Sequence, residues 1–255
     1  MRVIWLVGLN TFKESIRNKV LYNILLVAAV ALLLALSFGD LSVMSRIQVM
    51  SDFGLATMSL TGLLLAVFIG VGVLGAEITD KTAYGVLCKP VGRTQFIVGK
   101  FAGLFVTLIL NFILIAIVFV AAITVLAGQM PQADIYAAVF LLMIEMAVII
   151  AAAILASCFT TPTLAAIFTL AFYAAGHLND LISLSADAQA NPVMKTILVI
   201  LHYALPNLEH FNIRTQVVFG LPLADGFILL SFLYGVLYTA LLLLFSSLLF
   251  ARKDL

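Results

Sequence analysis

The chain has 255 residues, of which 64% are apolar and only 10% are charged, and its formal net charge is +1. Soluble domains are about half apolar and about a quarter charged, and a globule of this size leaves roughly a quarter to a third of its surface exposed to solvent. The composition therefore excludes a soluble enzyme, a disordered chain and a nucleic-acid-binding protein. It indicates an integral membrane protein.

Residues 1–19, ahead of the first long apolar run, are too polar to cross a membrane. An aromatic and aliphatic face opposite basic residues suits a helix that lies in the membrane interface. Packing of an amphipathic helix on neighbouring protein is the alternative. The apolar residues of this face recur every three or four positions, as on one side of a helix: Trp5, Leu9, Phe12, Ile16 and Val20.

Six apolar stretches are long enough to cross a bilayer, because about 20 helical residues at a rise of about 1.5 Å span a hydrocarbon core of about 30 Å. The alternating segments of about 10 residues that build a membrane β-barrel are absent from the sequence. We therefore predict an all-α polytopic membrane protein in which residues 1–255 form a single transmembrane domain. The six expected spans are Leu21–Phe38, Phe53–Ala76, Phe101–Ala127, Tyr136–Ser157, Phe159–His177 and Phe227–Ala251.

The connection between the second and third spans, residues 77–100, mixes acidic, basic and exposed apolar side chains. Such a surface suits the docking of a soluble protein, although most basic loops of this kind are only solvated. Pro90 is expected to end a short helical turn, and a second helix is expected to begin near Thr94. The loop does not match a phosphate-binding loop, because six residues separate Gly92 from Gly99 where four are required.

The fourth span carries one acidic residue, Glu145, near its middle. A carboxylate at the bilayer centre costs about 2.5–3.5 kcal/mol on insertion scales, so this side chain should face protein or water. No Lys or Arg lies in any predicted span, and the expected hydrogen-bond partners are Asn111, Thr107 and Tyr173. Glu145 and Asn111 are candidates for a transport pathway or a subunit contact. The alternative is a protonated carboxyl with a purely structural role.

Residues 178–226, between the fifth and sixth spans, are too many for a structureless loop. Within them Val193–Leu205 is apolar but too short to span, and Pro206 follows it. This pattern predicts an external re-entrant or interfacial helix. Together with Leu208–Phe219 it is expected to form a cap over the bundle.

Three histidines lie in or beside this external segment: His177, His202 and His210. With Asp180 and Glu209 they are candidates for an external metal site. No H-x-x-x-H or C-x-x-C spacing accompanies them, so ordinary interfacial polar residues are the preferred interpretation.

The basic residues indicate the orientation. With six spans both termini lie on one side, and that side would hold ten of the 13 Lys and Arg residues. Because cytoplasmic loops are enriched in Lys and Arg, both termini are predicted to be cytoplasmic.

The segment from Glu77 to Lys100 resembles the motif of ABC-2 type transporter permeases, E-x-x-x-[GK]-T, about seven residues, P-V-[SG]-R, and then G-K entering the third span. Lys89 ahead of Pro90 and Arg93 resembles the subgroup of multicopper enzyme maturation permeases. The similarity covers the whole chain in layout and about 24 positions in specific residues. The matching residues are Glu77, Lys81, Thr82, Pro90, Val91, Gly92, Arg93, Gly99 and Lys100.

The resemblance implies a permease subunit in the plasma (inner) membrane of a bacterium or archaeon, in contact with membrane lipid. Two such subunits, identical or different, would form the pathway, and each would dock a separate ATPase subunit that binds ATP and magnesium. This chain would bind no cofactor and carry no catalytic residue, and export is the expected direction. The implied ATPase-coupling residues are Glu77, Asp80, Lys81, Thr82, Lys89, Pro90 and Arg93, with Phe12, Glu14 and Arg17 of the N-terminal helix contributing to the same contact.

Three other functions are considered. A stand-alone ion-coupled carrier would use Glu145 as its proton site, although no inverted repeat is visible in the sequence. An integral membrane enzyme would need a nucleophile–base pair or metal ligands within the spans, and the predicted span interiors hold neither. A structural subunit that only anchors an ATPase is the remaining alternative.

Overall fold

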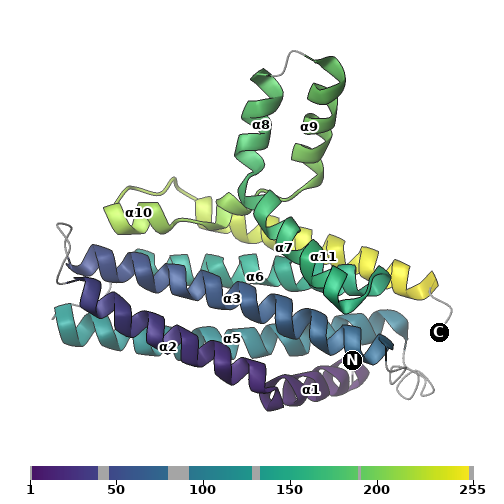
Figure 1. The fold of residues 1–255 in the computed structure, drawn as a ribbon, viewed down its shortest axis with the longest axis horizontal. Coiled ribbons are helices and arrows are strands. Elements are labelled where there is room, and N and C mark those ends of the chain that lie inside the picture. Colours follow the sequence, from purple (N-terminus) through teal and green to yellow (C-terminus); the bar gives the residue numbers. More distant parts are fainter. Residues whose placement is uncertain (1, 40–45, 80–91, 128–132, 189–190, 253–255) are drawn as a thin grey trace.

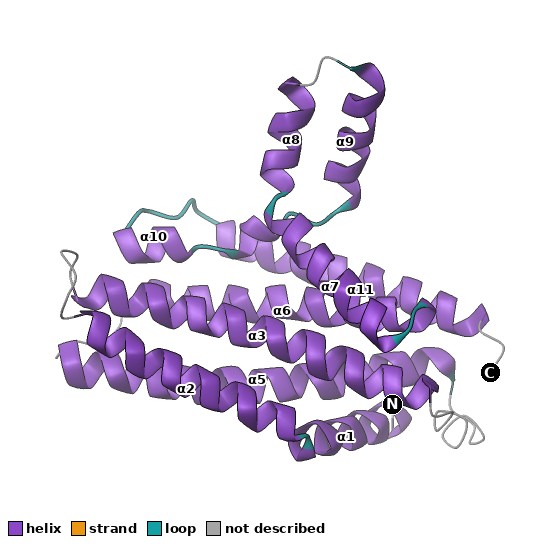
Figure 2. Ribbon diagram, in the orientation of Figure 1, coloured by secondary structure: helices purple, strands orange, loops and turns teal. Residues whose placement is uncertain are grey.

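The computed structural model describes residues 2–39, 46–79, 92–127, 133–188 and 191–252, and this part of the chain is helical without any strand (Figures 1 and 2). The predicted all-α class is therefore confirmed. In chain order the elements are α1 (Arg2–Arg17), α2 (Lys19–Gly39), α3 (Arg46–Thr79), α5 (Arg93–Ala127), α6 (Ala133–Phe159), α7 (Pro162–His177), α8 (Asn179–Ala188), α9 (Pro192–Ala204), the 3₁₀ helix η1 (Leu208–Phe211), α10 (Arg214–Phe219) and α11 (Phe227–Arg252).

Four of these helices, α3, α5, α6 and α11, are long and apolar enough to cross a membrane. They correspond to the second, third, fourth and sixth predicted spans. A fifth crossing is formed if α7 and α8, which are bent against each other, are counted as one span. The first predicted span lies in α2, whose described apolar stretch, Leu21–Ala31, is shorter. Helix length and hydropathy thus identify a multi-pass membrane protein with four or five long apolar helices.

The fifth predicted span differs from a straight helix over Phe159–His177. Helix α6 continues to Phe159, and α7 begins only at Pro162, which occupies the first turn as expected. At the other end of α7 the chain bends by 62° into α8. The buried side chain of Asn179 stabilises this bend, because its Nδ2 lies 3.3 Å and 3.2 Å from the carbonyl oxygens of His202 and Leu205 at the end of α9.

The α8–α9 hairpin projects away from the side of the bundle in Figure 1. The expected short external helix is present as α9, which begins at Pro192 with the Asn191 side chain accepting a hydrogen bond from the Val193 amide at 3.0 Å. No residue of α9 is buried, so this helix is available to lipid or protein along its whole length. The following η1 and α10 pack against α3, α6 and α7 instead.

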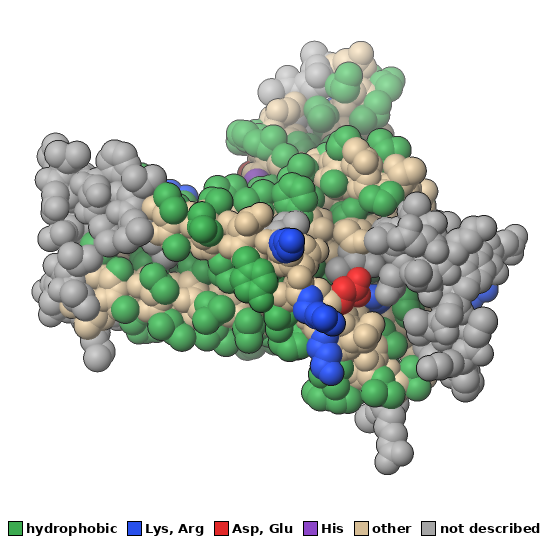
Figure 3. Space-filling model, turned by 60° about the horizontal axis from the view of Figure 1, so that its bottom comes forward, with side chains coloured by type: hydrophobic (Ala, Val, Ile, Leu, Met, Phe, Trp, Pro, Cys, Tyr) green, Lys and Arg blue, Asp and Glu red, His purple; other side chains and the backbone are tan. Residues whose placement is uncertain are grey.

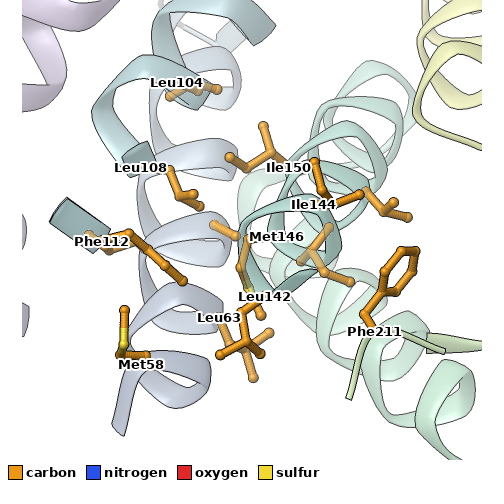
Figure 4. Close-up of a cluster of buried hydrophobic side chains, with 14 of the residues drawn as sticks. Met58, Leu63, Leu104, Leu108, Phe112, Leu142, Ile144, Met146, Ile150 and Phe211 are labelled. Atoms are coloured by element: carbon orange, nitrogen blue, oxygen red, sulfur yellow. The ribbon is translucent and has the colours of Figure 1, made fainter. Parts of the chain in front are cut away.

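Helix α6 forms the centre of the bundle and packs against α3, α5, α7 and α11. Its sequence is apolar on all sides, which is the pattern of a helix surrounded by other protein. Figure 4 shows part of the resulting core, in which Phe112 of α5 and Leu63 of α3 lie beside Met146 of α6. Helices α3 and α5, which were predicted as the second and third spans, are thereby both held against α6.

Helix α1 packs on α5 through small residues rather than through its predicted apolar face. A Cβ atom added to Gly103 would lie 2.5 Å from the carbonyl oxygen of Gly8 and 2.7 Å from Cβ of Thr11, so the two backbones approach closely. Thr11 and Ser15 are fully buried in this contact, whereas Trp5 is 70% exposed. The amphipathic helix is confirmed, and it packs on protein with one face while its aromatic face stays open to the surroundings.

The two described chain ends lie at the same end of the bundle (Figure 1). Arg93, the first residue of α5, donates hydrogen bonds to the carbonyl oxygens of Phe250, at 3.2 Å, and Ala251 near the end of α11. The first turns of α5 also carry the contact with α1.

We predict that Gly103→Ala destabilises the protein by about 1–3 kcal/mol, because the added methyl group must displace the backbone of α1. Gly72→Ala is the matched control, since a Cβ atom there meets no other atom within 4 Å. The control should be neutral or stabilising by about 0.5–1 kcal/mol through helix propensity. Thermal unfolding in mild detergent measures both, and equal shifts for the two variants would contradict the close contact of α1 with α5.

Candidate functional site

The buried carboxyl of Glu145 pairs with a histidine. Its Oε1 atom lies 2.9 Å from Nε2 of His177, the last residue of α7, and the side chain of Glu145 is 1% exposed. The predicted partners Asn111, Thr107 and Tyr173 are therefore wrong, and a base does stand beside this carboxyl. His177 was missed because the sequence places it at the outer edge of the fifth span, whereas the bend after α7 leaves it at the depth of Glu145.

The residues that had been expected to bind Glu145 have other partners. Asn111 donates from Nδ2 to the carbonyl oxygen of Thr107 in its own helix, at 2.8 Å, and its buried Oδ1 has no partner among the described residues. The hydroxyl of Tyr173 lies 3.3 Å from Oγ of Ser59, and its ring contacts the imidazole of His177 edge-on at a centroid distance of 4.5 Å. Tyr173 thus orients His177 rather than Glu145.

A second carboxyl stands on the other side of the imidazole. Nδ1 of His177 lies 3.1 Å from Oε1 of Glu209 in η1. Side-chain exposure rises along the series from 1% for Glu145 through 19% for His177 to 38% for Glu209. These three side chains, here called the Glu–His–Glu chain, connect the interior of the bundle with its surface.

The Glu–His–Glu chain carries one negative charge whenever both contacts are hydrogen bonds. Each nitrogen–oxygen contact needs one proton, and a neutral imidazole supplies only one. The second proton resides either on the imidazole or on a carboxyl group. In both arrangements the sum of one imidazole and two carboxyls is one net negative charge.

A cavity of about 180 Å³ lies between α3, α6, α7 and the η1–α10 segment. Polar groups of Glu145, Tyr173 and Ser59 share its wall with apolar groups such as Leu142 and Phe211. The second carboxyl oxygen of Glu145, Oε2, is buried and has no hydrogen-bond partner in the part of the chain that is described. Burying a carboxyl oxygen without a hydrogen-bond partner is energetically costly.

An ion pair closes one edge of the cavity. Arg214 at the start of α10 binds Asp52 of α3 with two parallel contacts, Nη2 to Oδ2 at 2.7 Å and Nε to Oδ1. This bidentate geometry fixes the η1–α10 segment on the end of α3. The side chains of Asp52 and Arg214 are each 40% exposed, so the pair lies where the cavity meets the surface.

The histidines do not gather into a metal site. Over the described ranges, which leave out residues 189–190 of this segment, no three His, Cys, Asp or Glu side chains are placed to hold a metal ion. Asp180 accepts a hydrogen bond from Asn207 at 2.7 Å, and His202 pairs with Asn179 at 2.8 Å. The ring of His210 packs edge-on against Tyr234.

The other end of the bundle holds the residues expected to contact an ATPase. Glu77 lies in the last turn of α3, while Asp80, Lys81, Thr82, Lys89 and Pro90 lie outside the described residues. Helix α5 begins at Arg93, one residue before the expected start. Figure 3 shows Lys and Arg side chains, with an acidic one beside them, gathered at this end on an otherwise apolar face.

The predicted contact residues of α1 occupy different environments. Glu14 forms an ion pair with Lys100 at 3.6 Å, and Lys100 is buried with its ammonium group 5.7 Å from the centroid of the Phe96 ring. Phe12 lines an apolar groove between α1 and α5, and Arg17 is exposed. Glu14 is therefore tied to α5, whereas Arg17 is accessible.

Neither a scan of protein-family models nor a search of curated proteins finds a match to this chain. The resemblance to ABC-2 permeases thus rests on the motif residues and the layout of helices.

We predict that His177→Leu destabilises the protein by about 3 kcal/mol or more, because it leaves the Glu145 carboxyl buried without a partner. The double variant Glu145→Leu/His177→Leu should be destabilised by less than the sum of the two single variants. In the double variant both members of the buried pair are removed, so neither is left without its partner. Thermal or denaturant-induced unfolding of the purified protein measures this double-mutant cycle.

His210→Leu is the control for this cycle. It removes an exposed imidazole that makes only an edge-on contact with Tyr234, so its effect should stay within about 0.5–1 kcal/mol. Additive effects of the Glu145 and His177 substitutions would show that the two side chains are not coupled.

Proposed function

We propose that the chain is the permease subunit of an ATP-driven transporter of the ABC-2 type. A separate ATPase would bind it at the end where α3 and α5 meet α1. The observation that carries this proposal is the set of contacts made by the described half of the motif. Arg93, Gly99 and Lys100 each join α5 to another helix. A protein bound at residues 77–92 would therefore act on several helices at once.

Each of the three motif residues has its own physical role. Arg93 binds the last carbonyl groups of α11, which have no partner within that helix. Gly99 allows α1 to approach, because a Cβ atom there would lie 2.8 Å from Cβ of Val7 and 3.1 Å from the carbonyl oxygen of Ile4. Lys100 holds Glu14 of α1 from a buried position.

The proposed mechanism transmits movement through these contacts. An ATPase that closes on nucleotide would displace the Glu77–Gly92 segment, and α5 would pull α11 through Arg93 and α1 through Lys100. ATP and magnesium would be bound by the ATPase subunit, which supplies the free energy. The apolar outer faces of α11 and of the α8–α9 hairpin are exposed and suit contact with lipid and with a second permease subunit.

We predict that charge reversal at Glu77 and Asp80 abolishes copurification of the ATPase and lowers ATPase activity of the assembled complex by about tenfold or more. The matched controls are Asp134→Lys and Asp225→Lys, which reverse exposed acids at the far ends of α6 and α11. The assay is purification of the tagged full chain from its native membrane in mild detergent. Normal recruitment by both reversal variants would refute the coupling assignment.

A second candidate function is an ion-coupled carrier that works without an ATPase. The Glu–His–Glu chain favours it, because it provides proton-binding groups from the interior to the surface. Against it, the sequence shows no inverted repeat of the kind found in many such carriers.

Proteoliposomes that contain the purified chain alone separate the two candidates. An ABC permease should produce no proton flux in response to an imposed pH gradient, as measured with an entrapped pH-sensitive dye. A carrier should produce a flux that Glu145→Gln removes and that Asp134→Asn leaves unchanged.

A further inference from the structure

The cavity beside Glu145 has a negative wall and an unused acceptor. With both of its contacts made as hydrogen bonds, the Glu–His–Glu chain contributes one net negative charge, and the charge of Arg214, which also lines the cavity, is balanced by its ion pair with Asp52. Glu145 lines this space, and its buried Oε2 atom has no hydrogen-bond partner among the described residues. A cation with hydrogen-bond donors would satisfy both the charge and the acceptor.

We propose that this cavity binds a primary ammonium group, either of a free small amine or of the amino headgroup of a lipid. The ammonium group has three donors and no acceptor. The residues that line the cavity include Glu145, Tyr173, Ser59 and Asn212, whose side-chain oxygens can accept hydrogen bonds. Tyr173 and Phe211 line the same space, and aromatic rings attract a cation that lies over their faces.

The alternatives fit this wall less well. Calcium takes six to eight oxygen ligands and magnesium demands six in an octahedron, whereas no group of side chains suited to a metal ion is found where the chain is described. An anion is disfavoured, because it would lie beside the acceptor oxygens of the Glu145 carboxyl. A purely apolar molecule would leave that oxygen unsatisfied.

The size of the cavity limits the ligand. An engineered cavity of about 150 Å³ in another protein holds benzene, so a space of about 180 Å³ accepts about six heavy atoms. Larger molecules would enter only with an amino-bearing end. We place the entrance at the Asp52–Arg214 ion pair, because Arg214 lines the cavity and its side chain is 40% exposed.

This inference goes beyond the proposed function and does not depend on it. Binding of the amine would need only this chain, and it would occur whether ATP or an ion gradient drives transport. A failed ATPase recruitment experiment would leave the amine site untouched, and the absence of amine binding would leave the coupling segment untouched.

The first experiment uses the purified full-length chain in detergent and ethylammonium chloride as the probe. The melting temperature should rise in a saturable manner with ethylammonium, as expected for a ligand that binds only the folded state. Sodium chloride at equal ionic strength, ethanol and tetramethylammonium chloride are the comparisons. The proposal is overturned if ethylammonium has no saturable effect or if sodium chloride has the same effect.

Variants locate the site. Glu145→Gln should weaken ethylammonium binding by about tenfold or more, because it removes the charge and keeps the shape. Tyr173→Phe, which removes one hydroxyl, should weaken it by a smaller factor. Asp134→Asn, an exposed acid of the same helix, should bind as the unaltered protein does. Equal affinity of Glu145→Gln and the unaltered protein would overturn the assignment even if an amine binds elsewhere.

Nanodiscs distinguish the two sources of the ammonium group. Discs of phosphatidylethanolamine present a primary ammonium headgroup, and discs of phosphatidylcholine present a quaternary one without N–H donors. A Glu145-dependent stabilisation in the first lipid over the second, with competition by ethylammonium, assigns the site to a lipid headgroup. Ethylammonium binding of equal strength in both kinds of disc assigns it to a free amine.

Discussion

The pairing of Glu145 with His177 is the constraint on which the outer half of the molecule depends. A carboxyl in the middle of the most buried helix requires a polar partner, because an unpartnered one costs several kcal/mol in a water-free interior. The only base that the described chain places there is the last residue of α7. The end of α7 and Glu209 of η1 are thereby both connected to one side chain on α6.

Helix α3 extends from the end that is proposed to dock an ATPase to the cavity beside Glu145. Its last turn holds Glu77 at the end where an ATPase is proposed to dock, and its first turns hold Asp52, which binds Arg214. Between them Ser59 lines the cavity and contacts Tyr173. Helix α3, which is continuous over 34 residues, therefore joins the end proposed to dock an ATPase to the wall of the cavity.

Much of the fold could be predicted from hydropathy and length alone. The long apolar helices α3, α5, α6 and α11, the turn at Pro162 and the short helix at Pro192 agree with the sequence patterns that predicted them. The bend after His177 was not predictable, because it is stabilised by Asn179 binding to residues more than twenty positions away. The packing face of α1 was missed for a similar reason: small residues such as Gly8 acquire their role only against Gly103.

Composition and local periodicity are enough to predict an all-helical membrane protein with a carboxyl, Glu145, near the middle of an apolar span. What that carboxyl contacts depends instead on how the helices pack. Glu145 and His177 lie 32 residues apart, and they meet because α6 and α7 run antiparallel from a tight turn and α7 ends at the same depth. Depth and facing direction depend on where helices stop and bend, and long-range side-chain contacts set those points.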